Sequence, residues 1–420
     1  MNPPRSLRPP AAVSAACFAL SAVSFVIGWV LLVIAAPDAE SFFYQPRVLA
    51  ITHTFTLGWI SLTIMGVLYQ FVPALTKRPI AWARAAPYQV GLFAFGALGM
   101  VSHFWIGHVA GMEWSAGVVW ISVALLLCLL LPPLLQAPQV DATVIGVVCG
   151  LLCFFGTATL GLLYAIDKVH PFLGGSVLSN IAGHAHLGLL GWVTLTICAV
   201  SYRLVAAFVL PEVLLPAPAR RQIVVLACLV PALVIALLLR SEMSRLVAVA
   251  VMVTLAWYGA LIMRMIRTRR MPIDWSIMHV VAALAHLAGA VAGALTLLFA
   301  VDPGTVLGNR VVLAYGMLAL VGWVSNFIIG VASRLLAGLA GKGAQPLLTD
   351  AARAAVFGLL NVGLVAAVAA VLAGQAAVLR GAALLPLGAG LWFGIVLLRR
   401  LQPLRRAHRS AMDDGIKEGT

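Results

Sequence analysis

The chain has 420 residues, of which 63% are hydrophobic and 10% are charged, and its mean hydropathy is +1.06. This composition excludes a soluble globular domain and indicates a membrane protein that crosses the bilayer several times. The formal net charge is +14, but the basic residues are spread over alternate loops, so we expect no nucleic-acid partner. The apolar runs do not alternate with polar residues, which excludes a transmembrane β-barrel.

Twelve apolar runs of spanning length follow one another along the chain. The predicted fold class is therefore an all-α integral membrane protein with twelve transmembrane helices. We expect them at residues 12–36, 47–74, 86–108, 114–137, 142–166, 178–206, 221–240, 245–267, 275–301, 309–335, 350–373 and 381–401.

One sequence pattern recurs in the second, sixth and tenth runs. Its copies begin at His53, His186 and Met317, which are 133 and 131 residues apart, and in each copy a Gly-Trp pair follows five residues later. A period this long indicates a threefold duplication of a multi-helix unit. We therefore expect a single membrane domain over 1–420, built as three pseudo-threefold four-helix arcs. The arcs cover about 12–137, 142–267 and 275–401, and the three repeat-bearing helices lie nearest the centre.

The glycines and tryptophans of the pattern have a predicted role in packing. We expect the glycines to let neighbouring helices approach closely and the tryptophans to fill the centre, at Gly58, Gly191, Gly322, Trp59, Trp192 and Trp323.

Arginine and lysine are distributed unequally between the two sets of loops. If the N-terminus is cytoplasmic, the cytoplasmic loops hold eleven basic residues and the tail more, whereas the outer loops and helix ends hold Arg47, Lys168, Arg240, Arg245, Arg310 and Arg380. The positive-inside rule then predicts both termini, including a tail at 402–420, on the cytoplasmic side. We expect a multi-pass protein of the bacterial inner membrane, surrounded by lipid.

Histidines gather toward the outer side of the predicted bundle. His53 lies six residues past Arg47, roughly 9 Å into its helix, and His184 and His186 lie at a similar depth. His103 and His108 lie near the outer end of the third helix, whereas His279 and His286 share one face of the ninth helix. Ionisable side chains inside a membrane are costly and usually functional.

A neutral imidazole is a common ligand for heme iron and for copper, and an interhelical hydrogen bond is the alternative role. We favour a ligand role for the repeat-related His53 and His186. His184 and His186 point about 200° apart on a helix, so they can serve two sites on opposite sides. The candidate metal ligands are His184, His186, His103, His108 and His286. Cys149 and Cys153, one turn apart, could bind Cu(I), but small buried side chains are the favoured interpretation.

Twelve helices in three arcs of four, with a His early in the second helix and His in the sixth, resemble subunit I of the heme–copper oxidases, including the cbb3-type and nitric-oxide-reductase branches. The chain also resembles the NnrS family, in which a His-Ala phrase precedes a Gly-rich helix, as in His184-Ala185-His186. The first resemblance implies that His53 matches the low-spin heme ligand. It further implies that His184 or His186 matches the copper ligand of the sixth helix.

The sequence departs from the oxidase pattern in three places. The tenth helix of that family carries His-x-His, where this chain has Tyr315-Gly316-Met317. Its seventh helix carries a His pair, and residues 221–240 contain no His. Acidic and lysine side chains in mid-span are also missing. We therefore expect the scaffold without an intact binuclear oxygen-reducing site.

The expected function is that of a divergent heme–copper-oxidase-like protein that binds a b-type heme, with copper as a further candidate. Its axial ligands would be His53 with Met317, His186 or His184, and its role would lie in electron transfer or in nitric-oxide- or oxygen-related respiration. A cytochrome c or a respiratory-complex subunit is the expected partner, and whether the chain is an enzyme stays open because a partner could supply missing groups. The alternative is a membrane protein for copper or heme trafficking or transport.

Overall fold

The computed structural model describes residues 11–339 and 349–417. In this part of the chain twelve helical segments are long and apolar enough to cross a membrane, as predicted. Eight are single helices, and the repeat-bearing second, sixth and tenth are each divided into three consecutive pieces. The single helices are α1 (Ala11–Ile34), α5 (Ala110–Leu135), α6 (Ala142–Val169), α9 (Pro216–Leu238), α10 (Met243–Arg267), α11 (Trp275–Phe299), α14 (Asp350–Ala373) and α15 (Ala376–Lys417).

The third span consists of a short 3-10 turn, η4 (Ala83–Ala85), and α4 (Ala86–Ile106). The divided spans are α2 (Pro46–His53), η3 (Thr54–Ser61) and α3 (Leu62–Thr76); α7 (Val177–His186), η5 (Leu187–Thr194) and α8 (Leu195–Val209); and α12 (Val306–Met317), η6 (Leu318–Ser325) and α13 (Asn326–Leu339). We call residues 11–135 unit 1, residues 142–267 unit 2, and residues 275–399 unit 3.

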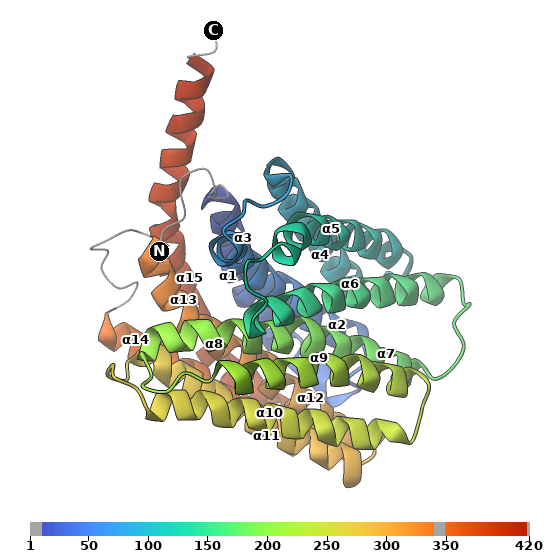
Figure 1. Cartoon of the computed structure of the whole chain (residues 1–420). Coiled ribbons are helices and arrows are strands. Elements are labelled where there is room, and N and C mark those ends of the chain that lie inside the picture. Colours follow the sequence, from blue (N-terminus) through green and yellow to red (C-terminus); the bar gives the residue numbers. More distant parts are fainter. Residues whose placement is uncertain (1–10, 340–348, 418–420) are drawn as a thin grey trace.

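Several helix ends differ from the sequence-based prediction, among them the start of α9 and the end of α15. α9 begins at Pro216, five residues before the expected start, because proline is well suited to the first turn of a helix. α15 continues as a helix to Lys417, through the segment expected to form a tail from 402. Ala and Arg, which favour helices, supply five of the residues between 402 and 417. Figure 1 shows α15 extending beyond the rest of the bundle.

The middle pieces η3, η5 and η6 are π-helices, and they occupy the same eight positions of the repeat. At the end of η3 the Leu62 N–H donates to the Leu57 carbonyl, and at the end of η5 the Leu195 N–H donates to the Leu190 carbonyl. These bonds connect residues five apart, as a π-helix requires. The three copies of the repeat therefore share an uncommon backbone conformation as well as a sequence pattern.

The repeat glycines lie where two helices of one unit touch. A Cβ atom built on Gly58 would meet the Ser24 Cβ at 2.6 Å, and one on Gly191 would meet the Cys153 Cβ at 2.7 Å. In unit 3, Gly322 would meet the His286 Cβ at 2.6 Å. Each glycine of the middle helix therefore contacts the first helix of its own unit, as the sequence predicted.

The three repeat tryptophans join the units into a closed ring of hydrogen bonds. Trp59 Nε1 donates to Ser325 Oγ at 2.9 Å, Trp192 Nε1 donates to Ser61 Oγ at 3.0 Å, and Trp323 Nε1 donates to Thr194 Oγ1 at 3.4 Å. Each unit thus donates to the unit before it in cyclic order, which is the arrangement expected from an approximate threefold axis.

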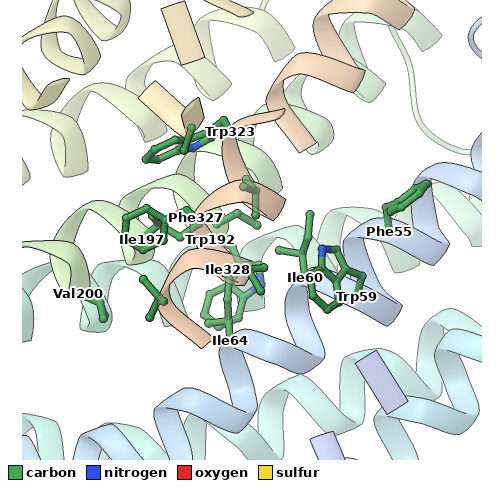
Figure 2. Close-up of a cluster of buried hydrophobic side chains, with 14 of the residues drawn as sticks. Phe55, Trp59, Ile60, Ile64, Trp192, Ile197, Val200, Trp323, Phe327 and Ile328 are labelled. Atoms are coloured by element: carbon green, nitrogen blue, oxygen red, sulfur yellow. The ribbon is translucent and has the colours of Figure 1, made fainter. Parts of the chain in front are cut away.

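Aromatic and branched aliphatic side chains fill the space around this ring. Figure 2 shows the indoles of Trp59, Trp192 and Trp323 together with Ile64, Ile197 and Ile328, contributed by all three units. The three tryptophans are at most 2% exposed. The centre of the bundle at this level is therefore a packed core.

Unit 3 contains a buried polar network in its interior. Asn326 and Asn361 pair through two reciprocal amide bonds of 3.0 and 3.1 Å. His279 Nδ1 donates to the Asn326 carbonyl oxygen at 2.8 Å, and His286 Nε2 donates to the Asn361 carbonyl oxygen at 2.9 Å. The remaining amide hydrogens donate to backbone carbonyls one turn earlier. The network connects α11, α13 and α14, and both of its amide groups have all their hydrogen bonds.

Candidate functional site

A cavity of about 810 Å³ lies at the end of the bundle opposite the start of α1. Its volume is in the usual range for small-molecule and cofactor sites. Side chains from all three units line it, and most are apolar. The chemically distinctive ones are His53, His184, His186, Lys168, Tyr315 and Met317.

The repeat places His53, His186 and Met317 at corresponding points of the cavity wall. Each is the last α-helical residue before the π-helix of its unit. Ser61 and Trp192 of the tryptophan ring also line the cavity, so the ring forms part of its floor. The structure therefore brings together the three residues that the repeat had related in sequence.

The ring of His53 is held from two sides. Its Nδ1 lies 2.8 Å from the Leu49 carbonyl oxygen, and its ring centroid lies 4.8 Å from that of Phe104. Because a carbonyl can only accept, Nδ1 carries the proton and Nε2 keeps its lone pair. In the described part of the chain Nε2 has no hydrogen-bond partner. This is the arrangement that orients a histidine for metal ligation through Nε2.

His186 has the same hydrogen bond at Nδ1 as His53, but its Nε2 has a neighbour. Its Nδ1 lies 2.8 Å from the Ala182 carbonyl oxygen, so Nε2 again has the lone pair. Here, however, the Tyr315 hydroxyl lies 3.5 Å from Nε2, and the two rings are nearly parallel with centroids 6.2 Å apart. The hydroxyl of Tyr315 is therefore placed to donate to the nitrogen that would otherwise face the cavity.

His184 turns toward α6, on the other side of α7. A Cβ on Gly161 would lie 3.0 Å from its Cε1, and its ring meets Tyr164 edge to face at 6.0 Å. Within residues 11–339 and 349–417, the buried polar atoms His184 Nδ1, Tyr164 Oη and Trp29 Nε1 have no hydrogen-bond partner, and all three residues line the cavity. Unpaired buried polar groups are unfavourable, so the cavity wall has hydrogen-bonding capacity that an occupant can satisfy.

The wall beside Met317 is open. A Cβ built on the neighbouring Gly316 would meet no atom within 4 Å. Gly161, Gly188 and Gly304 also line the cavity. A Cβ on these three would meet His184, Thr157 or Asp302 at 3.0 to 3.2 Å, so of the four glycines it is Gly316 that leaves room for a flat group.

The other predicted ligands lie outside this cavity. His103 and His108 form their own pair, with ring centroids 5.3 Å apart, and His108 Nδ1 accepts from the Gly111 N–H. His286 belongs to the amide network of unit 3. Among the residues that the structure describes, no group of three or more His, Cys, Asp or Glu side chains is arranged to hold a metal ion. A metal role for these three histidines stays a prediction.

The sequence does not predict the roles of several residues that matter in the structure. Tyr315 departs from the His of the oxidase pattern, and its hydroxyl meets His186. Asn326 and Asn361 form the amide pair of unit 3. Alignment of the repeats contains a signal for the first of them, because Asn326 follows the pattern where units 1 and 2 have Leu62 and Leu195.

Comparison with known proteins adds information about the fold. No family model and no curated protein matches the sequence. Among solved structures, a chain from the cryo-EM structure of a heme-copper terminal oxidase dimer is similar, with a TM-score of 0.65 at 10% sequence identity. The match covers 94% of this chain and 84% of that chain. The all-helical, twelve-span fold predicted from the sequence is thus shared with a heme–copper terminal oxidase.

Proposed function

We propose that this protein binds one b-type heme in the cavity at the end of the bundle, with His53 as a ligand of the iron, and acts in electron transfer or in nitric-oxide- or oxygen-related respiration. The observation that carries the proposal is the state of His53. Its Nδ1 is bonded to a backbone carbonyl and its ring packs on Phe104, whereas Nε2 has a free lone pair beside a cavity of about 810 Å³.

The residues around the cavity fit such a group in size and chemistry. The lining is mostly apolar, which excludes water and suits a macrocycle, and Gly316 allows close approach of a planar group. Lys168 also lines the cavity and can pair with carboxylates. When bound, a heme supplies one-electron chemistry, while the protein fixes its position and surroundings.

The proposal does not include an oxygen-reducing binuclear centre. Tyr315 stands where the resembling family has a heme-ligating His, and α9 contains no His. The fold shared with a heme–copper terminal oxidase supports the scaffold. Under this proposal the protein lies in a bacterial inner membrane with both termini in the cytoplasm, and a cytochrome c or a respiratory subunit exchanges electrons at the cavity end.

The test is to purify the full chain from heme-supplemented cells, record a reduced-minus-oxidised optical spectrum, and quantify heme, copper and zinc. We expect about one heme per chain, and His53→Ala should lose it because His186, whose Nδ1 is held in the same way, has the Tyr315 hydroxyl at its Nε2. His170→Ala is the matched control, since His170 is an exposed histidine whose side chain is 73% accessible.

Two results would contradict the proposal. One is a wild-type protein without a Soret band after heme supplementation, and the other is a His53→Ala variant with unchanged heme content and spectrum. Copper without heme would instead favour the metal-trafficking alternative.

A further inference from the structure

We propose that the second axial ligand is the thioether of Met317, and that Tyr315 keeps His186 off the iron. This inference rests on the proposed heme function and specifies its ligand set. It departs from what the oxidase resemblance implies, because that family uses histidine at the position of Met317.

The repeat defines the candidates. His53, His186 and Met317 occupy corresponding positions at the ends of α2, α7 and α12, and all three line one cavity. The approximate threefold arrangement therefore presents two alternatives to complement His53, an imidazole from unit 2 and a thioether from unit 3. The threefold symmetry does not distinguish these two candidates, so we compare the hydrogen bonds that each side chain makes.

Both ring nitrogens of His186 have a neighbour that matches their protonation state. Nδ1 donates to the Ala182 carbonyl at 2.8 Å, and Nε2 faces the Tyr315 hydroxyl at 3.5 Å. Ligation through Nε2 would require the hydroxyl of Tyr315 to find another acceptor. Tyr315 is two residues before Met317 on α12. The same helix therefore positions both the hydroxyl that contacts His186 and the proposed ligand Met317.

His184 is a weaker candidate because of its direction. His184 lines the cavity, but its ring packs near Gly161 and Tyr164 of α6, away from the side of α7 that presents His186, the repeat counterpart of Met317. Met317, by contrast, has an open wall beside it at Gly316. A thioether is a weak hydrogen-bond acceptor, so its ligation displaces no hydrogen bond.

The ligand set has a measurable electronic consequence. Methionine–histidine ligation raises the reduction potential of a heme relative to two histidines. Ferric heme with a thioether ligand also shows a sulfur-to-iron charge-transfer band in the near infrared. Both readouts are independent of any catalytic activity.

The experiment compares five full-length proteins: the wild type, Met317→Leu, His186→Ala, Tyr315→Phe and Met100→Leu. Met100 also lines the cavity, so Met100→Leu is the matched control for loss of a thioether. We expect the near-infrared band and a low-spin spectrum in the wild type, His186→Ala and Met100→Leu. Met317→Leu should keep heme through His53 but lose the band and become high-spin.

Tyr315→Phe tests the second half of the inference. Without the hydroxyl, His186 Nε2 is free to compete with the thioether, so the band should weaken and the midpoint potential should fall. An unchanged band and potential would show that Tyr315 does not hold His186 back.

The remaining outcomes are separable. A high-spin spectrum in His186→Ala with an unchanged Met317→Leu would make His186 the ligand and overturn the inference while leaving the heme proposal intact. A wild-type low-spin spectrum in both variants would overturn it as well. Absence of heme from the wild type would instead remove the proposed function itself.

Discussion

Unit 3 and unit 2 have the same backbone plan but place their polar groups differently. Unit 2 has His184 and His186 at the cavity end, and at the position of Asn326 it has the apolar Leu195. Unit 3 has Met317 at the cavity end, and its two histidines lie lower, bonded to Asn326 and Asn361. The presence of a histidine in this bundle is therefore not enough to identify a ligand. What distinguishes His53 from His286 is whether the lone-pair nitrogen faces the cavity or the side chain is engaged in a polar network.

The largest expected loss of stability follows from a substitution in the amide pair of unit 3, Asn326 and Asn361. Asn361→Val would remove the acceptor of one Asn326 amide hydrogen and the acceptor of His286 Nε2 inside the membrane. Each unpaired buried polar group costs about 1–3 kcal/mol, so the free energy of unfolding should fall by about 2 kcal/mol or more. The measurement is reversible unfolding in mixed micelles for Asn361→Val, Asn326→Leu and the double variant.

A double-mutant cycle isolates the pairing itself. We expect a coupling energy of about 1 kcal/mol or more for Asn326 with Asn361, within the range of residues that share a network. Leu195 and Val230, fully buried apolar residues of α8 and α9, provide the control cycle. A coupling in unit 3 no larger than that of Leu195→Ala with Val230→Ala would show that the amide bonds add nothing beyond packing.

Much of the fold could be predicted from the sequence because its signals are local. The hydropathy of each span, the recurrence of Gly-Trp and the period of the repeat gave the helices, the three units and the close approach at Gly58. The π-helices could not be predicted, because Leu187–Thr194 differs from an α-helical sequence in no residue type that requires the wider turn.

The site was predicted only in part, for a reason that concerns distance along the chain. The repeat identified His53, His186 and Met317, which the structure places on one cavity. The partner of His186 is Tyr315, 129 residues away, and the partner of His286 is Asn361, 75 residues away. Which nitrogen of a histidine is occupied depends on such contacts, and hydropathy and spacing do not contain them.

The glycines of the three units offer a second test of the comparison, with an intermediate effect. An alanine at any of them is overpacked, which costs about 1–3 kcal/mol. Gly322→Ala should lower the free energy of unfolding most. The added Cβ would lie 2.6 Å from the Cβ of His286, whose ring is hydrogen-bonded to Asn361. Gly58→Ala should cost less, since it meets the small side chain of Ser24.

The control for the glycine series is Gly91→Ala. A Cβ there would meet no atom within 4 Å, so the substitution should leave stability unchanged or raise it slightly through helix propensity. If Gly58→Ala and Gly322→Ala proved equal in thermal unfolding, the network of unit 3 would not restrain His286.

The smallest expected effect concerns the tryptophan ring, which is the feature that the units share. Hydrogen bonds between transmembrane helices contribute on average about 0.6 kcal/mol and at most about 1.7 kcal/mol. Ser61→Ala and Ser325→Ala should each lower stability by about 1 kcal/mol, because their bonds to tryptophan are 3.0 and 2.9 Å long. Thr194→Val should cost less, since Trp323 Nε1 lies 3.4 Å from its hydroxyl. Ser325 also donates to the Leu320 carbonyl at 3.0 Å, so its substitution removes two bonds and should have the largest effect of the three. Thermal unfolding in one detergent, ranked across the three variants, measures this order directly. Equal losses at all three sites would mean that the ring is held by indole packing and that the hydroxyl distances have no influence on stability.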